Sequence, residues 1–336
     1  MTPKRSIIPV FVPHLGCPNN CVFCNQRRIA GQTKPACAES VRLALDGSSG
    51  KLPEGVKAQL AYYGGSFTAI PEQLQNELLD AAQPYLREGA VDSLRLSTRP
   101  DAIDAQTLDR LKEYGVKTIE LGAQSMCDEV LKQSGRGHTA EQTEKAARLV
   151  RAAGFELILQ MMTGLPGDSL ERSIETAERI IALKPDGVRI YPTVIIEDTP
   201  LCELWRRGEY AEHTVEQAVE YCAELLPRFE RAQIPIIRLG LNPSDELSCG
   251  GAVGGAYHPA LGELVRSRVL YKRARELLED MRGSERVLLF VHPSQISMMV
   301  GQHRENIERL QSELGIKQIK IHAGDVPKGA LRAAED

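Results

Sequence analysis

The feature that most constrains the fold is an alternation of strand-like and helix-like segments that begins near residue 6. Six apolar runs have the length of strands, and amphipathic segments separate them. The runs are Ile7–Val12, Gln59–Tyr63, Ser93–Thr98, Thr118–Gly122, Phe155–Met162 and Gly187–Thr193. Successive strand–helix units imply a parallel sheet with right-handed crossovers, which a doubly wound sheet and a partial barrel both satisfy. No G-x-G-x-x-G follows the first strand, and this counts against a dinucleotide-binding fold.

Helix start signals support this division. Thr139 with Gln142 predicts a capping box, and Asp168 with Glu171 predicts another. After the sixth strand the pattern changes, and helical stretches lead to a seventh predicted strand at Ile236–Leu239.

The composition is that of an ordinary globular chain. Of 336 residues, 42% are hydrophobic and 26% are charged, and the net charge is −4. No apolar run approaches the roughly 20 residues that a membrane helix needs, and the start lacks the apolar core of a signal peptide. We therefore expect a cytoplasmic protein without membrane association. Residues 1–38 carry a net charge of +5 and residues 264–336 carry +3, which leaves −12 for the middle.

Three of the eight cysteines fall in one short segment after the first strand. Cys17, Cys21 and Cys24 have C-x3-C-x2-C spacing, and three thiolates can hold three irons of a [4Fe–4S] cluster while the fourth iron stays open. A structural zinc site with His14 as fourth ligand is the alternative. Four scattered cysteines show no ligand spacing, so we expect no second cluster: Cys37, Cys127, Cys202 and Cys222.

Small and polar residues gather where the predicted strands end. The ends read YYGGSF, STRPD, LGAQS and MMTGLPG, and Phe23 precedes the last cysteine of the triad. Together with the cysteines, these strings resemble the radical S-adenosylmethionine (SAM) superfamily. The resemblance implies an α/β fold with a partial (β/α)6 TIM-like barrel, a [4Fe–4S] cluster, and SAM that is cleaved to a 5′-deoxyadenosyl radical.

By the same resemblance, residues at the strand ends bind SAM. The glycines after the second strand would bring the backbone close to the SAM amino group, although the superfamily often has an acid where Ser66 stands. Arg136 is the expected partner of the SAM carboxylate, because a guanidinium fork matches that geometry. The full expected set is Phe23, Gly64, Gly65, Ser66, Ser97, Arg99, Gln124, Arg136, Met162 and Gly164.

Longer strings narrow the resemblance to one branch. YYGGSFTAI, STRPDAID, IELGAQSM, GRGHT, MMTGLPGD and RIYPTVIIEDTPLCELWRRGEY occur in this order, as in the radical domain of the Elongator catalytic subunit family. That family modifies the wobble uridine of tRNA. We therefore predict a transferase that modifies a base in tRNA or rRNA, with flavodoxin or ferredoxin as electron donor. Because few residues of the sequence follow the predicted barrel, we do not expect that family's acetyltransferase domain within it.

Two other functions remain open at this point. One is radical chemistry on a small molecule, as in relatives of coproporphyrinogen oxidase, or on a peptide. The other is a non-catalytic iron–sulfur protein that binds RNA. The intact cysteine triad and the intact glycines 64 and 65 count against this second alternative.

The tail predicts a small C-terminal α+β module, with a barrel at residues 1–245 and the module at 246–336. A strand, a helix, the loop GQHR, a helix and a strand follow the βααβ order of a KH module, whose G-x-x-G loop contacts nucleotide backbone. The RNA-binding candidates are therefore Gly301, Gln302, His303 and Arg304, with Arg304 where the second glycine is expected. A βααβ unit that only caps the barrel is the alternative.

Three further residues are candidates for the chemistry. Cys249 lies in the glycine-rich segment SCGGAVGGAYHP, and a thiol can donate or relay a hydrogen atom. Glu120 and Tyr191 lie on the predicted fourth and sixth strands, and they can hold substrate or move protons if they point inward. The alternatives are a spectator thiol and outward-facing strand residues.

Overall fold

The computed structural model describes residues 5–12, 17, 21–25, 36–48, 56–242 and 247–335. The chain divides into two compact units, of which the first is Met1–Ala218 with Arg228–Pro259 and the second is Val219–Pro227 with Ala260–Asp336. The boundary predicted at 245/246 lies within the first unit, because the glycine-rich segment belongs there. Among the described helices, none is long and apolar enough to span a membrane.

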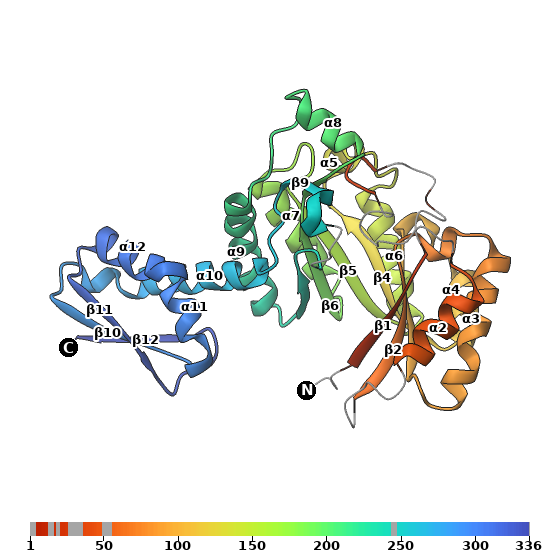
Figure 1. The fold of residues 1–336 in the computed structure, drawn as a ribbon, viewed down its shortest axis with the longest axis horizontal. Coiled ribbons are helices and arrows are strands. Elements are labelled where there is room, and N and C mark those ends of the chain that lie inside the picture. Colours follow the sequence, from red (N-terminus) through yellow and green to blue (C-terminus); the bar gives the residue numbers. More distant parts are fainter. Residues whose placement is uncertain are drawn as a thin grey trace. The chain divides into compact units, whose positions relative to one another are not determined.

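The first unit is built on a seven-stranded sheet in which every neighbouring pair is parallel. In spatial order its strands are β1 (Arg5–Phe11), β2 (Lys57–Tyr63), β3 (Ser93–Thr98), β4 (Val116–Gln124), β5 (Glu156–Thr163), β6 (Gly187–Pro192) and β8 (Ile236–Leu239). Figure 1 shows the sheet curled into an open half-barrel. The predicted partial barrel is confirmed, with a seventh strand. A doubly wound sheet is excluded, because the strand order never reverses.

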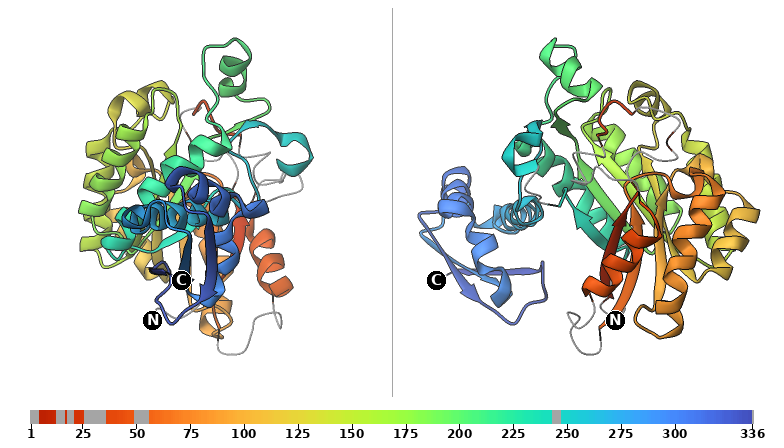
Figure 2. Two further views of the ribbon diagram at one scale, coloured as in Figure 1. Left: turned by 90° about the vertical axis from the view of Figure 1, so that its left-hand side faces the viewer. Right: turned by 45° about the vertical axis from the view of Figure 1, so that its right-hand side comes forward.

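Helices connect these strands and lie on the outer side of the curled sheet (Figure 1), and Figure 2 shows them from two further directions. They are α2 (Ala38–Ser48), α3 (Glu72–Arg87), α4 (Ala105–Glu113), α6 (Ala140–Ala152) and α7 (Leu170–Ala182). The shorter α5 (Asp128–Gln133) follows β4, and α8 (Pro200–Arg206) lies between β6 and β8 along the chain, whereas α9 (Val215–Arg231) is divided between the two units. The strands contribute fully buried Leu60, Leu94 and Ile119 to the core. A short antiparallel pair, β7 (Val194–Ile196) with β9 (Ala252–Gly255), completes the unit.

One predicted capping box is confirmed and the other is wrong. Thr139 and Gln142 cap α6 reciprocally, as expected. At α7 the N-cap is Ser169. The Asp168 carboxylate instead accepts the Gly164 N–H at 2.7 Å and the Ser173 hydroxyl at 2.7 Å. This carboxylate therefore links the end of β5 to the first turn of α7.

The second unit contains a three-stranded sheet in the order β11-β10-β12, in which β10 is parallel to β11 and antiparallel to β12. Its elements are α10 (Leu261–Leu277), β10 (Arg286–Val291), α11 (Ile296–Val300), α12 (Glu305–Leu314), β11 (Gln318–Ala323) and β12 (Leu331–Glu335). The predicted βααβ order is present in β10, α11, α12 and β11. One hydrophobic core joins the three helices to a single face of the sheet.

Candidate active site

The cysteine triad lies in the segment that follows β1. Cys21 is buried, whereas Cys17 and Cys24 are half-buried. The Cys24 backbone N–H donates to the Cys21 carbonyl at 3.1 Å, so these two residues share one turn. Among the described residues, no three His, Cys, Asp or Glu side chains converge on a single-metal site, and His14 lies outside those residues.

A guanidinium group faces the thiols. Arg136 Nη1 donates to Cys21 Sγ at 3.6 Å, and Nη2 donates to the Gly122 carbonyl at 2.8 Å. A Cβ at position 122 would lie 2.8 Å from this Nη2, so a larger residue there would displace the end of the arginine side chain. Burial raises the pKa of the Cys17 thiol, and the positive charge of Arg136 opposes that rise. Sequence reasoning identified Arg136 but not the glycine that admits it.

A second buried guanidinium lies at the end of β3. Arg99 is 2% exposed and forms a bidentate ion pair with Asp101, with N···O distances of 2.8 and 2.7 Å. Burial alone would raise the pKa of Asp101, but the hydrogen bonds and charge of Arg99 hold it below its usual value. The charge of Arg99 also acts on the Cys17 thiol. The cysteine segment therefore faces two arginines, from the ends of β3 and α5.

The loop after β2 is tied to the end of β3 by hydroxyl groups. Ser66 is fully buried, and its Oγ lies 2.9 Å from Thr98 Oγ1. The same Oγ accepts the Arg99 backbone N–H at 3.2 Å. Gly64 has a φ of +100°, a conformation that suits glycine and turns the chain at this point. Ser66 therefore positions the loop and the arginine that follows β3.

The ends of β4 and β5 are joined by an amide pair. Gln124 lies at a bulge in β4 with a φ of +64°. Its side chain pairs reciprocally with that of Gln160, at 3.1 and 2.6 Å. Sequence reasoning missed Gln160, because no motif spacing marks it. Two residues further along β5, Met162 is half-buried and lies beside Tyr191 in the sheet register.

Gly164 is packed against an imidazole ring. A Cβ at this position would lie 2.1 Å from the ring of His213, and the φ of +74° also requires glycine. The Tyr210 hydroxyl donates to the Gly164 carbonyl at 2.5 Å. Burial lowers the pKa of His213 to about 4, so this ring is neutral near pH 7. No pattern in the sequence pointed to His213.

Glu120 and Tyr191 meet in one network of side chains from four strands, which places both on the concave side of the sheet. Glu120 Oε1 accepts from Arg95 at 2.6 Å, from the Tyr63 hydroxyl at 2.9 Å and from Arg189 at 3.0 Å. Arg189 also donates to the Tyr191 hydroxyl at 3.2 Å. Burial, followed by the charge of Glu120, raises the pKa of Tyr63, which keeps its phenol protonated. Sequence reasoning missed both arginines, and it placed Tyr63 in the YYGGSF string without a role in this network.

The other sequence candidates occupy different surroundings. Phe23 packs against an apolar cluster that includes Leu201 and Tyr210. The Ser97 hydroxyl donates to the Tyr62 carbonyl at 3.4 Å. Cys249 is exposed. The loop of Gly301 to Arg304 belongs to the second unit.

Comparison with known protein families assigns the chain. The model of the radical SAM superfamily matches residues 11–180, half of the sequence. The chain belongs to the radical SAM superfamily. A radical SAM C-terminal domain matches residues 185–270 of this superfamily member.

Individual relatives of this radical SAM chain come from the Elongator group. Elongator complex protein 3 of Schizosaccharomyces pombe is 28% identical over 276 residues, which are 74% of this chain and 49% of that protein. The tRNA uridine(34) acetyltransferase of Methanocaldococcus jannaschii is 35% identical over 145 residues, 41% of this chain and 27% of that protein. The structure of Methanocaldococcus infernus Elp3 matches with a TM-score of 0.63 and 25% identity, covering 81% of this chain and 64% of that one. The chain spans about half the length, or less, of these curated relatives.

The residues of the site fit the cluster and cofactor that define a radical SAM protein. Three thiols are the donors that an iron–sulfur cluster takes. Around them, Arg99 Nη1, Arg136 Nε and His138 Nδ1 are buried and have no hydrogen-bond partner within the described residues. Burial, then the charges of the two arginines, lowers the pKa of His138 to about 3. The two guanidinium groups thus offer N–H donors to a carboxylate beside the thiols.

Proposed function

We propose that this radical SAM chain is an enzyme that modifies a base in tRNA or rRNA. The observation that carries the radical chemistry is the pair of buried guanidinium groups, Arg99 and Arg136, next to the cysteine triad. The RNA substrate is supported by relatives that are named for tRNA uridine(34) acetylation and for the Elongator complex.

Each part of the site has a defined task in this proposal. Cys17, Cys21 and Cys24 hold the cluster as thiolates, and the charge of Arg136 favours that form. A bound [4Fe–4S] cluster with SAM supplies reductive cleavage of SAM to a 5′-deoxyadenosyl radical. Arg136 and Arg99 hold the SAM carboxylate through the N–H groups that have no partner among the described residues.

In this proposal, the hydrogen-bonded network around Glu120 keeps the concave side of the barrel rigid. Glu120 is 4% exposed and Arg95 is 7% exposed, so both charges are shielded from water and paired with each other. Paired charges of this kind hold side chains in a single arrangement, and a radical must be presented with one fixed orientation to its substrate. Tyr191 belongs to this network and lies beside half-buried Met162 in the sheet register, so both side chains face the same concave side.

SAM cleavage tests the radical proposal. Anaerobically reconstituted protein reduced with dithionite is expected to convert SAM to 5′-deoxyadenosine. Cys21→Ala should abolish this conversion, whereas Cys37→Ala removes an exposed thiol outside the triad and should leave it intact. Arg136→Gln should lower the rate about 10- to 100-fold, by analogy with partners of metal ligands. It should also change the electron paramagnetic resonance signal of the reduced cluster.

Two results would contradict the radical proposal. One is full activity of Cys21→Ala. The other is an intact cluster that yields no 5′-deoxyadenosine even with candidate RNA present.

The RNA target needs a separate measurement. Nucleosides from a strain that lacks this gene should miss one modified base that the parent strain contains. An unchanged nucleoside profile together with active SAM cleavage would favour a small-molecule or peptide substrate. In the SAM-cleavage assay, flavodoxin or ferredoxin should be able to replace dithionite as the reductant. We also expect the protein to be located in the cytoplasm.

A further inference from the structure

The chain around α8 contacts the cysteine segment that follows β1. The Leu201 backbone N–H donates to the Val22 carbonyl at 2.8 Å, and the Asn25 side chain donates to the Glu197 carbonyl at 3.3 Å. Val22 and Phe23 also pack against an apolar cluster. That cluster consists of Ile195, Leu201, Cys202 and Tyr210. Residues far away along the chain therefore support the turn that carries the cysteines.

Tyr210 connects this cluster with the end of β5. The residue is 9% exposed, and its hydroxyl donates to the Gly164 carbonyl at 2.5 Å. Burial raises the pKa of this hydroxyl, so it remains a protonated donor at neutral pH. The ring of Tyr210 thus belongs to the cluster against which Phe23 packs, while its hydroxyl holds the turn after β5.

The turn at Gly164 is fixed by further contacts. The Asp168 carboxylate accepts the Gly164 N–H at 2.7 Å. The His213 ring occupies the place where a Cβ would lie at this position, and its Nε2 is 3.2 Å from Thr163 Oγ1. Because its N–H and its carbonyl are both hydrogen-bonded, the Gly164 backbone is held in one arrangement, and Tyr210 provides one of the two bonds.

The connection between α8 and α9, which carries Tyr210, is itself anchored. The Glu212 carboxylate accepts the Gly255 N–H of β9 at 2.7 Å. β9 pairs with β7, the strand that precedes α8. Gly255 lies close to that strand, since a Cβ there would be 2.9 Å from the Ile195 nitrogen. These contacts hold Tyr210 at a defined place beside the end of β5.

We propose that Tyr210 is a positioning residue for SAM, because it holds the cysteine segment and the end of β5 in one arrangement. This role rests on the proposed radical function. The expected SAM-binding residues lie on both parts, with Phe23 in the cysteine segment and Met162 and Gly164 at the end of β5. One ligand can contact both parts only when they are correctly placed. Tyr210 acts through Gly164.

Tyr210→Phe is the main test, since it keeps the ring and removes only the hydroxyl. The anaerobically reconstituted full chain, with its cluster oxidised and no reductant present, is dialysed to equilibrium against radiolabelled SAM. We expect the dissociation constant of SAM to rise about 3- to 10-fold, the range for loss of one hydrogen bond. The iron content per chain should equal that of the parent chain. With dithionite added, KM for SAM should rise while kcat is unchanged.

Tyr210→Leu removes the ring as well as the hydroxyl. This variant should bind SAM more weakly and should also take up less iron during reconstitution, because the cluster against which Phe23 packs loses its largest member. Its circular dichroism should match that of the parent chain, since the substitution keeps an apolar side chain.

Tyr62→Phe is the matched control. Tyr62 is fully buried, and its hydroxyl donates to the Leu78 carbonyl of α3 at 2.7 Å, so the same kind of hydrogen bond is lost. Thermal unfolding should show a similar loss of stability in Tyr62→Phe and Tyr210→Phe. Only Tyr210→Phe should change the dissociation constant of SAM.

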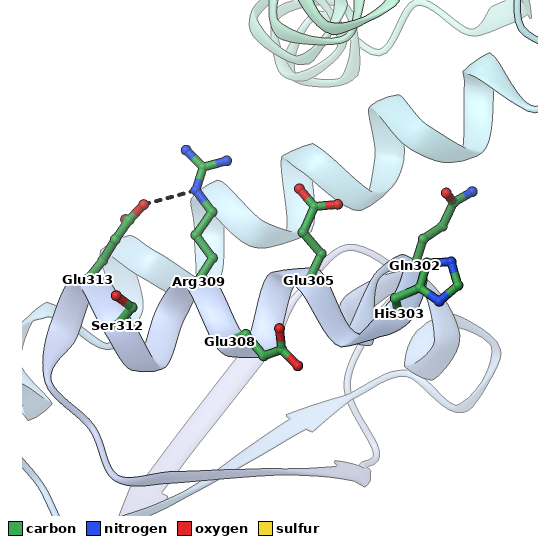
Figure 3. A pocket seen from close by; sticks show the side chains of 7 residues that line it. All are labelled: Gln302, His303, Glu305, Glu308, Arg309, Ser312 and Glu313. Atoms are coloured by element: carbon green, nitrogen blue, oxygen red, sulfur yellow. Dashed lines mark hydrogen bonds and ion pairs between the residues drawn. The ribbon is translucent and has the colours of Figure 1, made fainter.

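A second control lies in the second unit. Arg309 pairs with Glu313 along α12 at 2.9 Å, in the surface hollow that Figure 3 shows. Arg309→Gln removes this exposed pair and should leave both SAM affinity and iron content unchanged.

Two results would overturn the role of Tyr210. One is an unchanged dissociation constant of SAM in Tyr210→Phe, and the other is an equal rise in Tyr62→Phe. The parent chain separates this proposal from the radical function. If the parent binds and cleaves SAM, the radical function holds whatever the Tyr210 variants do, whereas a parent chain with an intact cluster that binds no SAM overturns both.

Discussion

The two sheets of this protein use charged side chains in opposite ways. On the concave face of the barrel, Arg95 and Arg189 both contact the Glu120 carboxylate, and the three side chains are between 6% and 13% exposed. In the three-stranded sheet of the second unit, Arg332 lies over the Phe290 ring and is exposed. The barrel therefore pairs these two cations with a buried carboxylate, whereas Arg332 of the small sheet stays in contact with solvent.

This difference follows from the environment of each sheet. A buried charge is stable only when it is paired, because desolvation disfavours an isolated ion. An exposed arginine remains solvated and needs no carboxylate partner. The same residue type is thus buried and paired in one sheet and solvated in the other.

Removing the buried carboxylate is the strongest test of this comparison. Glu120→Gln leaves Arg95 and Arg189 buried without a counter-charge, and we expect it to lower the free energy of unfolding by about 3–5 kcal/mol. Urea denaturation followed by circular dichroism measures the change.

The matched control lies in the second unit. Glu285 forms an ion pair with Lys317 in which both side chains are more than two-thirds exposed. Glu285→Gln should therefore change the free energy of unfolding by less than about 1 kcal/mol. Equal losses of unfolding free energy in Glu120→Gln and Glu285→Gln would show that burial does not determine how much an ion pair contributes.

Two glycines extend the comparison to the backbone. Gly164 and Gly283 have φ values of +74° and +75°, but only Gly164 has a side chain against it. Gly283→Ala should lower the free energy of unfolding by about 1 kcal/mol through backbone strain alone. Gly164→Ala adds a clash with His213 and should lower it by about 2–4 kcal/mol. Thermal unfolding measures the loss of stability in both variants. Equal losses would argue against tight packing at the end of β5.

The pH dependence of the free energy of unfolding gives the smallest expected effect, counted per pH unit. Burial lowers the pKa of His213 from its ordinary 6.5 to about 4, so the unfolded chain takes up a proton at higher pH than the folded chain. Stability from this residue is therefore complete above about pH 6.5 and is lost as the pH falls toward 4, by at most about 1.4 kcal/mol per pH unit. His213→Gln should make this slope shallower. A parallel slope in the variant and the parent chain would contradict a buried neutral imidazole.

The sequence predicted the elements of the large sheet well for a physical reason. Parallel strands are buried on both faces, so they appear as largely apolar runs such as Phe155–Met162, which overlaps β5. The predicted Ile236–Leu239 matches the edge strand β8 at both ends. The short β7 and the edge strand β12 were missed. The β12 segment LRAAE has no apolar run, because its polar residues Arg332 and Glu335 are exposed.

Site prediction succeeded where a motif is local and stopped where contacts are distant. The spacing of the cysteine triad lies within eight residues and is visible directly. Asp168 was assigned to a cap, but the adjacent Ser169 caps α7, because the Asp168 carboxylate binds the Gly164 N–H. His138 lies inside the GRGHT string, yet only the structure shows that it is buried beside Arg99 and Arg136.

From its sequence alone, this chain could be assigned a parallel α/β barrel, a C-x3-C-x2-C triad and a βααβ tail, because periodicity and short spacings are properties of neighbouring residues. The tertiary structure decided which distant groups meet. Arg136 reaches Cys21 across 115 positions, and Arg189 reaches Glu120 across 69. Such contacts depend on how the sheet curls and on its register, which no local pattern records. The same holds for the three-stranded sheet of the second unit, since only the packing of the helices determines which of its two faces is buried.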